Sequence, residues 1–243
     1  MKRLVITSTY PRHIEFVKTL ERYYEIEHVF CEHKNQNNVQ FSKLESKFFK
    51  NNFEDIKSKT TNVKCGEINS DNLKEKILKI NPDIILTFGC SLLKEKIFNI
   101  PKLGCVNIHT GIVQMFRGVD SCYWAIYNDQ PQAIGVTVHY INKTIDAGNV
   151  LIQSRTKNID PSDTPYSVFF KTCKTGFELL SDNLVKIEKQ NIKSQPLSKK
   201  GRLYLKKHMT QNVMNVVNNT CSNTISRYNN LKEHYDKRIT LIC

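Results

Sequence analysis

The chain has 243 residues, of which 40% are hydrophobic and 24% charged, the proportions of an ordinary globular protein. No apolar run approaches the roughly 20 residues that span a bilayer, and residues 1–7 are too short for a signal peptide, so we expect a cytoplasmic protein without a membrane partner. The net charge of +13 would suit nucleic acid or a phosphorylated small molecule. Because no basic run is interleaved with stacking aromatics, we expect no nucleic-acid partner.

The eight cysteines predict no metal or redox site. They lack a Cys-x-x-Cys pair and regular spacing, so we interpret them as reduced and mostly buried. Cys31 and His33 are the one close Cys/His pair, and a pair alone does not complete a tetrahedral zinc shell. We therefore expect no metal.

The first third of the chain alternates strand and helix patterns. Residues 3–7 form a compact apolar strand, Ile14, Val17 and Leu20 recur at helical spacing, and residues 25–31 predict a second strand. This order is typical of a parallel sheet covered by helices.

The pattern continues to the middle of the chain. Residues 41–57 are amphipathic, and Ser70 or Asp71 can cap a helix that ends before Pro82. Residues 83–88 are almost continuously apolar, which predicts a strand buried on both faces.

The next strand carries the first candidate functional residues. Residues 105–109 predict a short strand on which Asn107 and His109, two positions apart, share a face. Open α/β sheets place ligands at the carboxyl ends of such strands. The alternating run at 134–140 predicts a strand that returns the chain and brings Asp146 near them.

The remaining residues divide into a body and a tail. Residues 149–155 predict a strand, and Thr164 with Pro165 begins a long helix. We expect a catalytic domain over 1–189 and a small C-terminal subdomain over 190–243. The tail contains a short strand and one or two helices, which pack on the body or form a homodimer interface.

Asn107, His109 and Asp146 combine an amide, an imidazole and a carboxylate. An amide N–H can stabilise an oxyanion and a histidine can exchange a proton near neutral pH, so the set suits acyl transfer to an amine. The alternative is that each residue is structural, since an Asp before a small residue is most often a turn former. No glycine-rich phosphate loop and no Ser or Cys nucleophile elbow is present in the sequence.

Five ordered motifs strengthen the catalytic interpretation. They are Leu-Gly-Cys-Val-Asn-Ile-His at 103–109, Arg-Gly at 117–118, Trp-Ala-Ile at 124–126, Gly-Val-Thr-Val-His at 135–139 and Asp-Ala-Gly at 146–148. This stretch resembles the catalytic core of the formyltransferases that use N10-formyltetrahydrofolate. The resemblance implies an α/β, Rossmann-like, mostly parallel twisted sheet flanked by helices, with a short C-terminal extension.

The resemblance also implies roles for individual residues. Asn107, His109 and Asp146 match the family's catalytic positions, and N10-formyltetrahydrofolate would be the co-substrate. The expected folate-binding residues are Phe88, Gly89, Cys90, Ser91, Leu92, Leu93, His139, Tyr140, Ile141 and Ile145.

Three observations favour a nucleotide-linked amino sugar as formyl acceptor. The family's frequent Ser-Leu-Leu-Pro after the histidine is replaced from Thr110 onward by Thr-Gly-Ile-Val-Gln, and His-x-Gly followed by Arg-Gly resembles the sugar N-formyltransferases. The tail at 190–243 is too short for the C-terminal β-barrel of methionyl-tRNA formyltransferases. The first loop, 7–13, lacks the glycines of glycinamide ribonucleotide formyltransferases.

The expected acceptor is a dTDP-4-amino-4,6-dideoxyhexose, with a 3-amino isomer next, for O-antigen or other surface-polysaccharide (lipopolysaccharide) biosynthesis. Glycinamide ribonucleotide, methionyl-tRNA and a noncatalytic binding module remain alternatives. The expected substrate-binding residues are Ser8, Arg12, Thr110, Gly111, Arg117, Gly118, Tyr123 and Trp124. Arg117 as a loop brace and Trp124 as a core residue are the structural alternatives.

Overall fold

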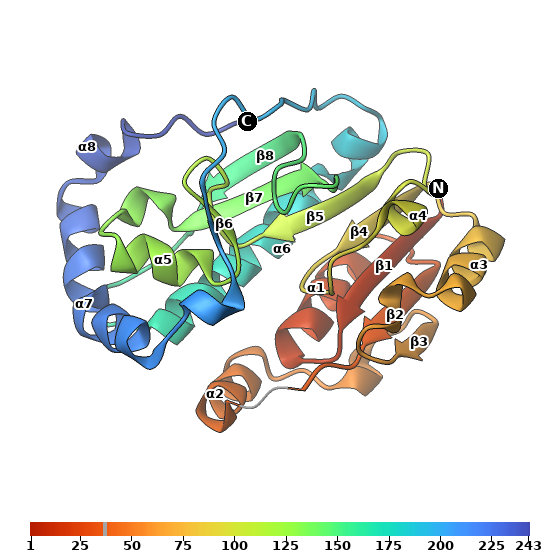
Figure 1. Cartoon of the computed structure of the whole chain (residues 1–243), viewed down its shortest axis with the longest axis horizontal. Coiled ribbons are helices and arrows are strands. Elements are labelled where there is room, and N and C mark those ends of the chain that lie inside the picture. The colour runs from red at the N-terminus through yellow and green to blue at the C-terminus, as the bar shows by residue number, and fades with distance from the viewer. Residues whose placement is uncertain (36–37) are drawn as a thin grey trace.

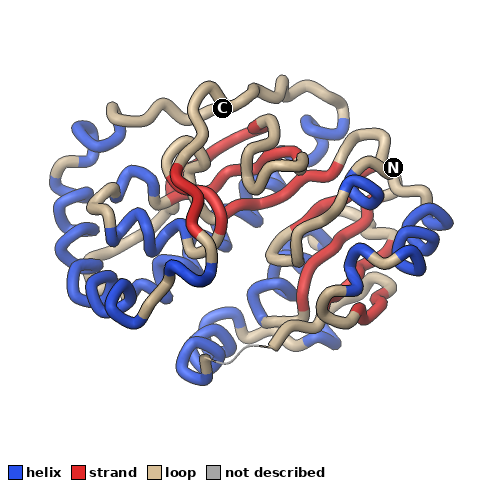
Figure 2. The backbone as a smooth tube through the Cα atoms, viewed as in Figure 1, coloured by secondary structure: helices blue, strands red, loops and turns tan. Residues whose placement is uncertain are grey.

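The computed structural model, which describes residues 1–35 and 38–243, is built on a seven-stranded sheet of order β3-β2-β1-β4-β5-β7-β8. The first five strands are parallel to one another, β7 is antiparallel to β5, and β8 is antiparallel to β7. The strands are β1 (Arg3–Ser8), β2 (His28–Glu32), β3 (Thr60–Val63), β4 (Ile84–Thr87), β5 (Cys105–His109), β7 (Gly135–Tyr140) and β8 (Val150–Arg155). The expected mostly parallel α/β sheet is confirmed, and Figure 2 shows its strands side by side between helices.

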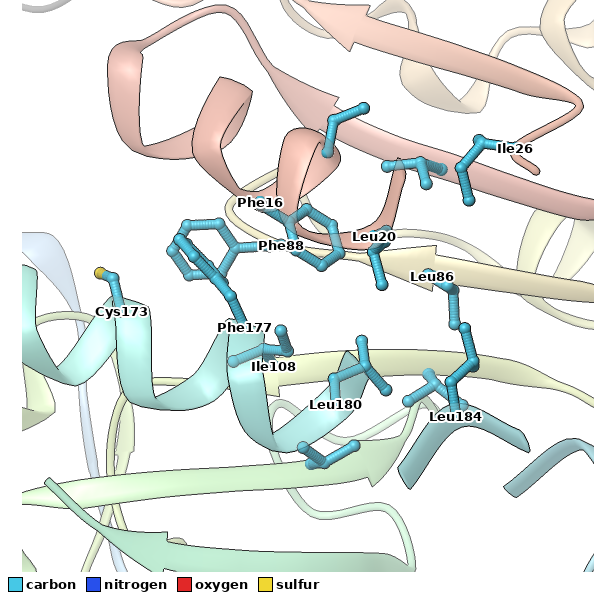
Figure 3. Close-up of a cluster of buried hydrophobic side chains, with 14 of the residues drawn as sticks. Phe16, Leu20, Ile26, Leu86, Phe88, Ile108, Cys173, Phe177, Leu180 and Leu184 are labelled. Carbon is cyan, nitrogen blue, oxygen red and sulfur yellow. The ribbon is translucent and has the colours of Figure 1, made fainter. Parts of the chain in front are cut away.

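One face of the sheet is covered by α1 (Pro11–Glu21), α2 (Val39–Phe49) and α6 (Pro165–Glu188). Val5 and Leu86 point into this layer, where Phe16 and Phe177 pack with ring centroids 5.4 Å apart (Figure 3). Each such fully buried side chain contributes about 2–3 kcal/mol. The main core therefore lies between α1, α6 and the sheet.

The opposite face is covered by α3 (Asp71–Ile80) and α4 (Glu95–Phe98). Leu4 and Ile6 pack here while Val5 packs on the other face, as the two-residue period of a strand requires. Caps begin the helices as expected: Ser70 accepts from the backbone N–H of Leu73, and Thr164 caps α6 in the same way.

A second core lies at the end of the molecule where α5 (Ser121–Tyr127), α7 (Gln211–Asn230) and α8 (Lys232–Asp236) gather (Figure 1). Here β9 (Arg202–Tyr204) pairs in parallel with β6 (Phe116–Gly118), and Trp124 stacks on Tyr204 with ring centroids 3.8 Å apart. The tail thus packs on the body, while the division at 189/190 stays a prediction. The described part of the chain also contains four short 3-10 helices: Phe53–Asp55, Glu67–Asn69, Pro131–Ala133 and Lys206–His208.

Several expected boundaries were wrong. The second strand begins at His28 rather than residue 25, and the helix expected over 41–57 ends at Phe49 because Lys50 adopts a left-handed backbone, φ 54°. Neither β3 nor β6 was expected. Both are short, with little alternation, and their place depends on a neighbouring strand.

Candidate active site

Asn107 lies in the middle of β5, two residues before its carboxyl end at His109, and is directly opposite His139 of β7. The hydroxyl of Thr87, at the end of β4, donates to Asn107 Oδ1 at 2.9 Å, which orients the amide. Asn107 Nδ2 then lies 3.2 Å from His139 Nε2. Since His139 Nδ1 is 2.8 Å from the carbonyl of Tyr140, we assign its proton to Nδ1 and the lone pair to Nε2. One amide N–H thus bonds His139, and the second is available to a ligand oxygen.

His109 is buried, 5% exposed, with each ring nitrogen facing an oxygen acceptor. Nδ1 lies 3.3 Å from Asp146 Oδ2, and Nε2 lies 3.1 Å from the carbonyl oxygen of Phe116. Burial lowers the pKa of His109, although the Asp146 carboxylate opposes this change. The neutral imidazole can donate to one of these oxygens, and protonation would add a hydrogen bond to the other, so the site can stabilise the protonated ring.

Asp146 connects both histidines. Its Oδ2 accepts from the backbone N–H of Gly118 at 2.8 Å, and its Oδ1 lies 3.5 Å from His139 Nε2. Burial works to raise the pKa of Asp146, but the attraction to His109 in its protonated form, the neighbouring His139 and the hydrogen bond from the Gly118 N–H together hold it below its usual value. Asp146 also has a left-handed backbone, φ 46°, a strained conformation of the kind that clusters at functional sites.

Gly111 makes room beside the histidine. A Cβ at this position would lie 2.4 Å from the Ser121 Cβ and 2.7 Å from His109 Nε2. A larger residue would therefore displace the imidazole from Asp146.

A cavity of about 420 Å³ opens over these residues. All three expected catalytic residues line it, as do nine of the ten expected folate-binding residues, with Tyr140 outside. Of the expected substrate-binding residues, Arg12, Thr110 and Gly118 line it. The structure thus brings the expected catalytic and folate-binding residues to one cavity, while their roles stay predictions.

The other expected substrate-binding residues lie outside the cavity lining: Ser8, Gly111, Arg117, Tyr123 and Trp124. The Ser8 hydroxyl donates to the carbonyl of Glu32. Arg117 donates to the carbonyls of Gly201 and Ile145, so it braces its loop as the structural alternative had it. Tyr123 and Trp124 are buried in the second core.

Sequence reasoning missed several residues of the cavity. His13 comes from the first turn of α1 and Phe169 from α6, while Tyr204, Leu205 and Lys206 come from the tail. The rest are Ile108, Val119 and Asp120. His13 follows a strand end, which was a usable signal. Lys206 reaches the cavity through the pairing of β9 with β6, for which the sequence holds no local signal.

A half-free amide donor, a buried neutral histidine and an ionised carboxylate at the carboxyl edge of a mostly parallel sheet are the groups of an acyl-transfer site. Residues 11–184 match the family model described as formyl transferase, and the chain belongs to this family.

Known proteins support the same family. The chain is 34% identical over 119 residues to a methionyl-tRNA formyltransferase of Clostridioides difficile, a match that covers 48% of this chain and 38% of the relative. The chain therefore spans less than half the length of that relative. Among solved structures, it is similar to a sugar N-formyltransferase from a Shewanella species, with TM-score 0.63, 19% identity, and 89% of this chain and 86% of that chain covered.

Another similar structure is an N-formyltransferase from Helicobacter canadensis in complex with folinic acid and dTDP-3-aminofucose. Its TM-score is 0.60 at 16% identity, with 86% of this chain and 73% of that chain covered. At these identities the likeness shows the fold. Within residues 1–35 and 38–243, no helix is both long and apolar enough to cross a membrane.

Proposed function

We propose that this protein transfers the formyl group of N10-formyltetrahydrofolate to the amino group of a nucleotide-linked sugar. The observation that carries the proposal is the convergence of Asn107, His109 and Asp146 on one cavity that the tail also lines. The solved structures that cover most of both chains include sugar N-formyltransferases, which supports the choice of acceptor.

The residues suit each step of such a transfer. Asn107 directs its second amide N–H at the oxygen of the formyl carbonyl, where negative charge develops as the amine attacks. His109 takes the proton that the amine releases, and Asp146 stabilises the resulting imidazolium through Nδ1. The same proton then passes from His109 to the leaving nitrogen of tetrahydrofolate, which returns His109 to its neutral form, while His139 Nε2, 3.2 Å from Asn107 Nδ2, keeps the amide oriented.

The cavity fits a flat aromatic co-substrate beside these groups. Phe88, Leu93, Ile141 and Ile145 supply an apolar lining, and Gly89 has φ +65°, which opens the loop after β4. The folate would supply an activated formyl group to this site. The chain itself binds, orients and exchanges protons.

Methionyl-tRNA is the second candidate acceptor, because the relative matched at 34% identity is a methionyl-tRNA formyltransferase. Its match covers 38% of that relative. A sugar acceptor is favoured because the likeness to the Shewanella enzyme extends over 89% of this chain and 86% of that one.

Formyl transfer to a panel of amino sugars linked to dTDP, UDP or GDP tests the proposal. We expect stoichiometric release of tetrahydrofolate and formylated product with at least one dTDP-linked 4-amino- or 3-amino-dideoxyhexose. His109→Asn and Asp146→Asn should lower turnover by about 10³-fold or more, while folding, measured by circular dichroism, is retained. Formylation of methionyl-tRNA with no sugar formylated would overturn the assignment.

A further inference from the structure

His13 is a buried histidine that the transfer steps above leave unused. It occupies the first turn of α1, is 1% exposed, and forms part of the cavity wall. Neither of its ring nitrogens has a hydrogen-bond partner among the residues that the structure describes. Burying a polar group without a partner costs about 1–3 kcal/mol, so two such atoms in one side chain call for a ligand.

The position of His13 is that of a ligand-binding residue. α1 leaves β1 toward β2, whereas the chain after β4 continues to β5 on the other side, so the sheet reverses its order between β1 and β4. Ligands of open α/β sheets bind at such a reversal. Gly89, which follows β4, accommodates the imidazole, since a Cβ there would lie 2.2 Å from His13 Nε2.

The surroundings of His13 fit a neutral, hydroxylated ligand rather than an anion. The nearby cations are already matched: Arg12 pairs with Glu45, while Lys34 pairs with Glu32 and donates to the Gly89 carbonyl. Burial, with these cations, lowers the pKa of His13 well below its usual value. A neutral imidazole has one donor and one acceptor, which matches a hydroxyl group.

Aromatic rings add to this match. The rings of Phe88 and Tyr10 lie 5.2 and 5.6 Å from that of His13, centroid to centroid, and Phe169 lines the same cavity. Asp120, also in the lining, has a left-handed backbone, φ 59°, and its carboxylate makes no hydrogen bond or ion pair to a described residue. A sugar ring presents both hydroxyls and apolar C–H faces to such a wall.

The geometry points to the acceptor rather than the folate as occupant. The expected folate segments follow β4 and β7, on either side of β5, whereas His13 follows β1, on the far side of β4. We propose that His13 hydrogen-bonds a ring hydroxyl of the sugar acceptor and thereby selects among acceptors. This inference rests on the proposed function.

Two variants of His13 and one matched control test it. His13→Phe keeps a flat ring but removes both nitrogens, and His13→Gln keeps a donor and an acceptor. His28 is the control, because it is also buried, lies outside the cavity lining and has a partner, Thr61 Oγ1 at 2.8 Å. Steady-state kinetics would be measured with the nucleotide-linked amino sugar that the panel above identifies as an acceptor and with N10-formyltetrahydrofolate. The thermal unfolding of each protein would be measured in parallel.

For His13→Phe we expect kcat/KM for the sugar to fall about tenfold, the loss of one hydrogen bond, with KM for the folate within twofold. Its Tm should equal or exceed that of the wild type, because unpaired buried nitrogens are removed, and His13→Gln should recover part of the loss. His28→Phe should lower Tm and leave kcat/KM unchanged. A structural role for His13 predicts the reverse pattern, with Tm reduced and sugar kinetics intact.

Monodeoxy versions of the acceptor give a readout that does not require His13→Phe to fold. The wild type should discriminate about tenfold against one of them, and His13→Gln should discriminate less. If no monodeoxy sugar is discriminated, or if folate KM rises as much as sugar KM, the assignment of His13 is overturned while the proposed function stands. If the wild type formylates no sugar, both are overturned.

Discussion

Replacing Asp146 by Asn removes the charge that stabilises the protonated His109. Their facing atoms are 3.3 Å apart, so at an effective dielectric constant of about 20 the attraction is about 5 kcal/mol. The carboxamide oxygen still accepts from the Gly118 N–H, so the turn is retained. Because 1.36 kcal/mol is a factor of ten, kcat should fall by about 10³-fold or more if the proton reaches His109 in the rate-limiting step.

The assay is single-turnover formyl transfer under saturating folate and sugar, with equilibrium binding of each measured separately. Binding should change less than threefold, because the loss lies in the charged state that forms during transfer. Lys157→Gln is a suitable control, since Lys157 and its partner Glu178 are both at the surface and lie outside the cavity lining. A kcat for the Asp146→Asn protein within tenfold of wild type would show that His109 is not the base or that Asp146 does not act through it.

Three further predictions follow from the same contacts. Asn107→Ala should lower kcat by about 10²-fold, which corresponds to about 3 kcal/mol of barrier. Thr87→Val should lower kcat less, because it only removes the hydrogen bond that orients the Asn107 amide. If wild type, Asn107→Ala and Thr87→Val have the same kcat, Asn107 is not the oxyanion donor. Glu32→Gln should raise KM for the folate and lower the free energy of unfolding by about 2 kcal/mol, since buried Glu32 accepts from the Ser91 N–H at 2.8 Å; an unchanged KM in steady-state assays would contradict this positioning role. The pKa of Asp146 is lower in the folded protein than in the unfolded chain, where it is about 3.9, so Asp146 contributes stability above about pH 4 and this contribution is lost as the pH falls further. The free energy of unfolding, measured with urea, should therefore decrease more for the wild type than for Asp146→Asn between pH 4 and lower pH; equal decreases would contradict this.

Local sequence patterns predicted most of the helices and strands of the fold. The apolar runs that became β1, β4 and β5 are buried on both faces, and such strands are continuous in hydrophobicity whatever packs on them. Ser70 and Thr164 cap helices because a side-chain oxygen and a backbone N–H a few residues away suffice. By contrast, β3 and β6 become strands through pairing with β2 and β9, which no local pattern encodes.

The site divides in the same way. Asn107 and His109 share a face of one strand, so their proximity follows from a two-residue period, and the family motifs placed Asp146 with them. The aromatic Tyr123 and Trp124 were expected to contact substrate, but they lie in the core around α5. An aromatic side chain suits a core and a sugar site equally well, so residue type alone did not decide between them.

By itself, then, the sequence determined the order of most strands and helices, β3 and β6 excepted, together with the catalytic candidates on β5 and the family resemblance, because these depend on short-range periodicity and on motifs within about fifty residues. The tertiary structure alone decided that His13, Asp120 and Lys206, from segments far apart in the chain, line one cavity with them. It also decided that the nitrogens of His13 have no hydrogen-bond partner within residues 1–35 and 38–243, while Arg117 donates to two carbonyls. Whether a polar group is satisfied depends on which distant atoms the fold brings within about 3 Å of it, and no local pattern contains that information.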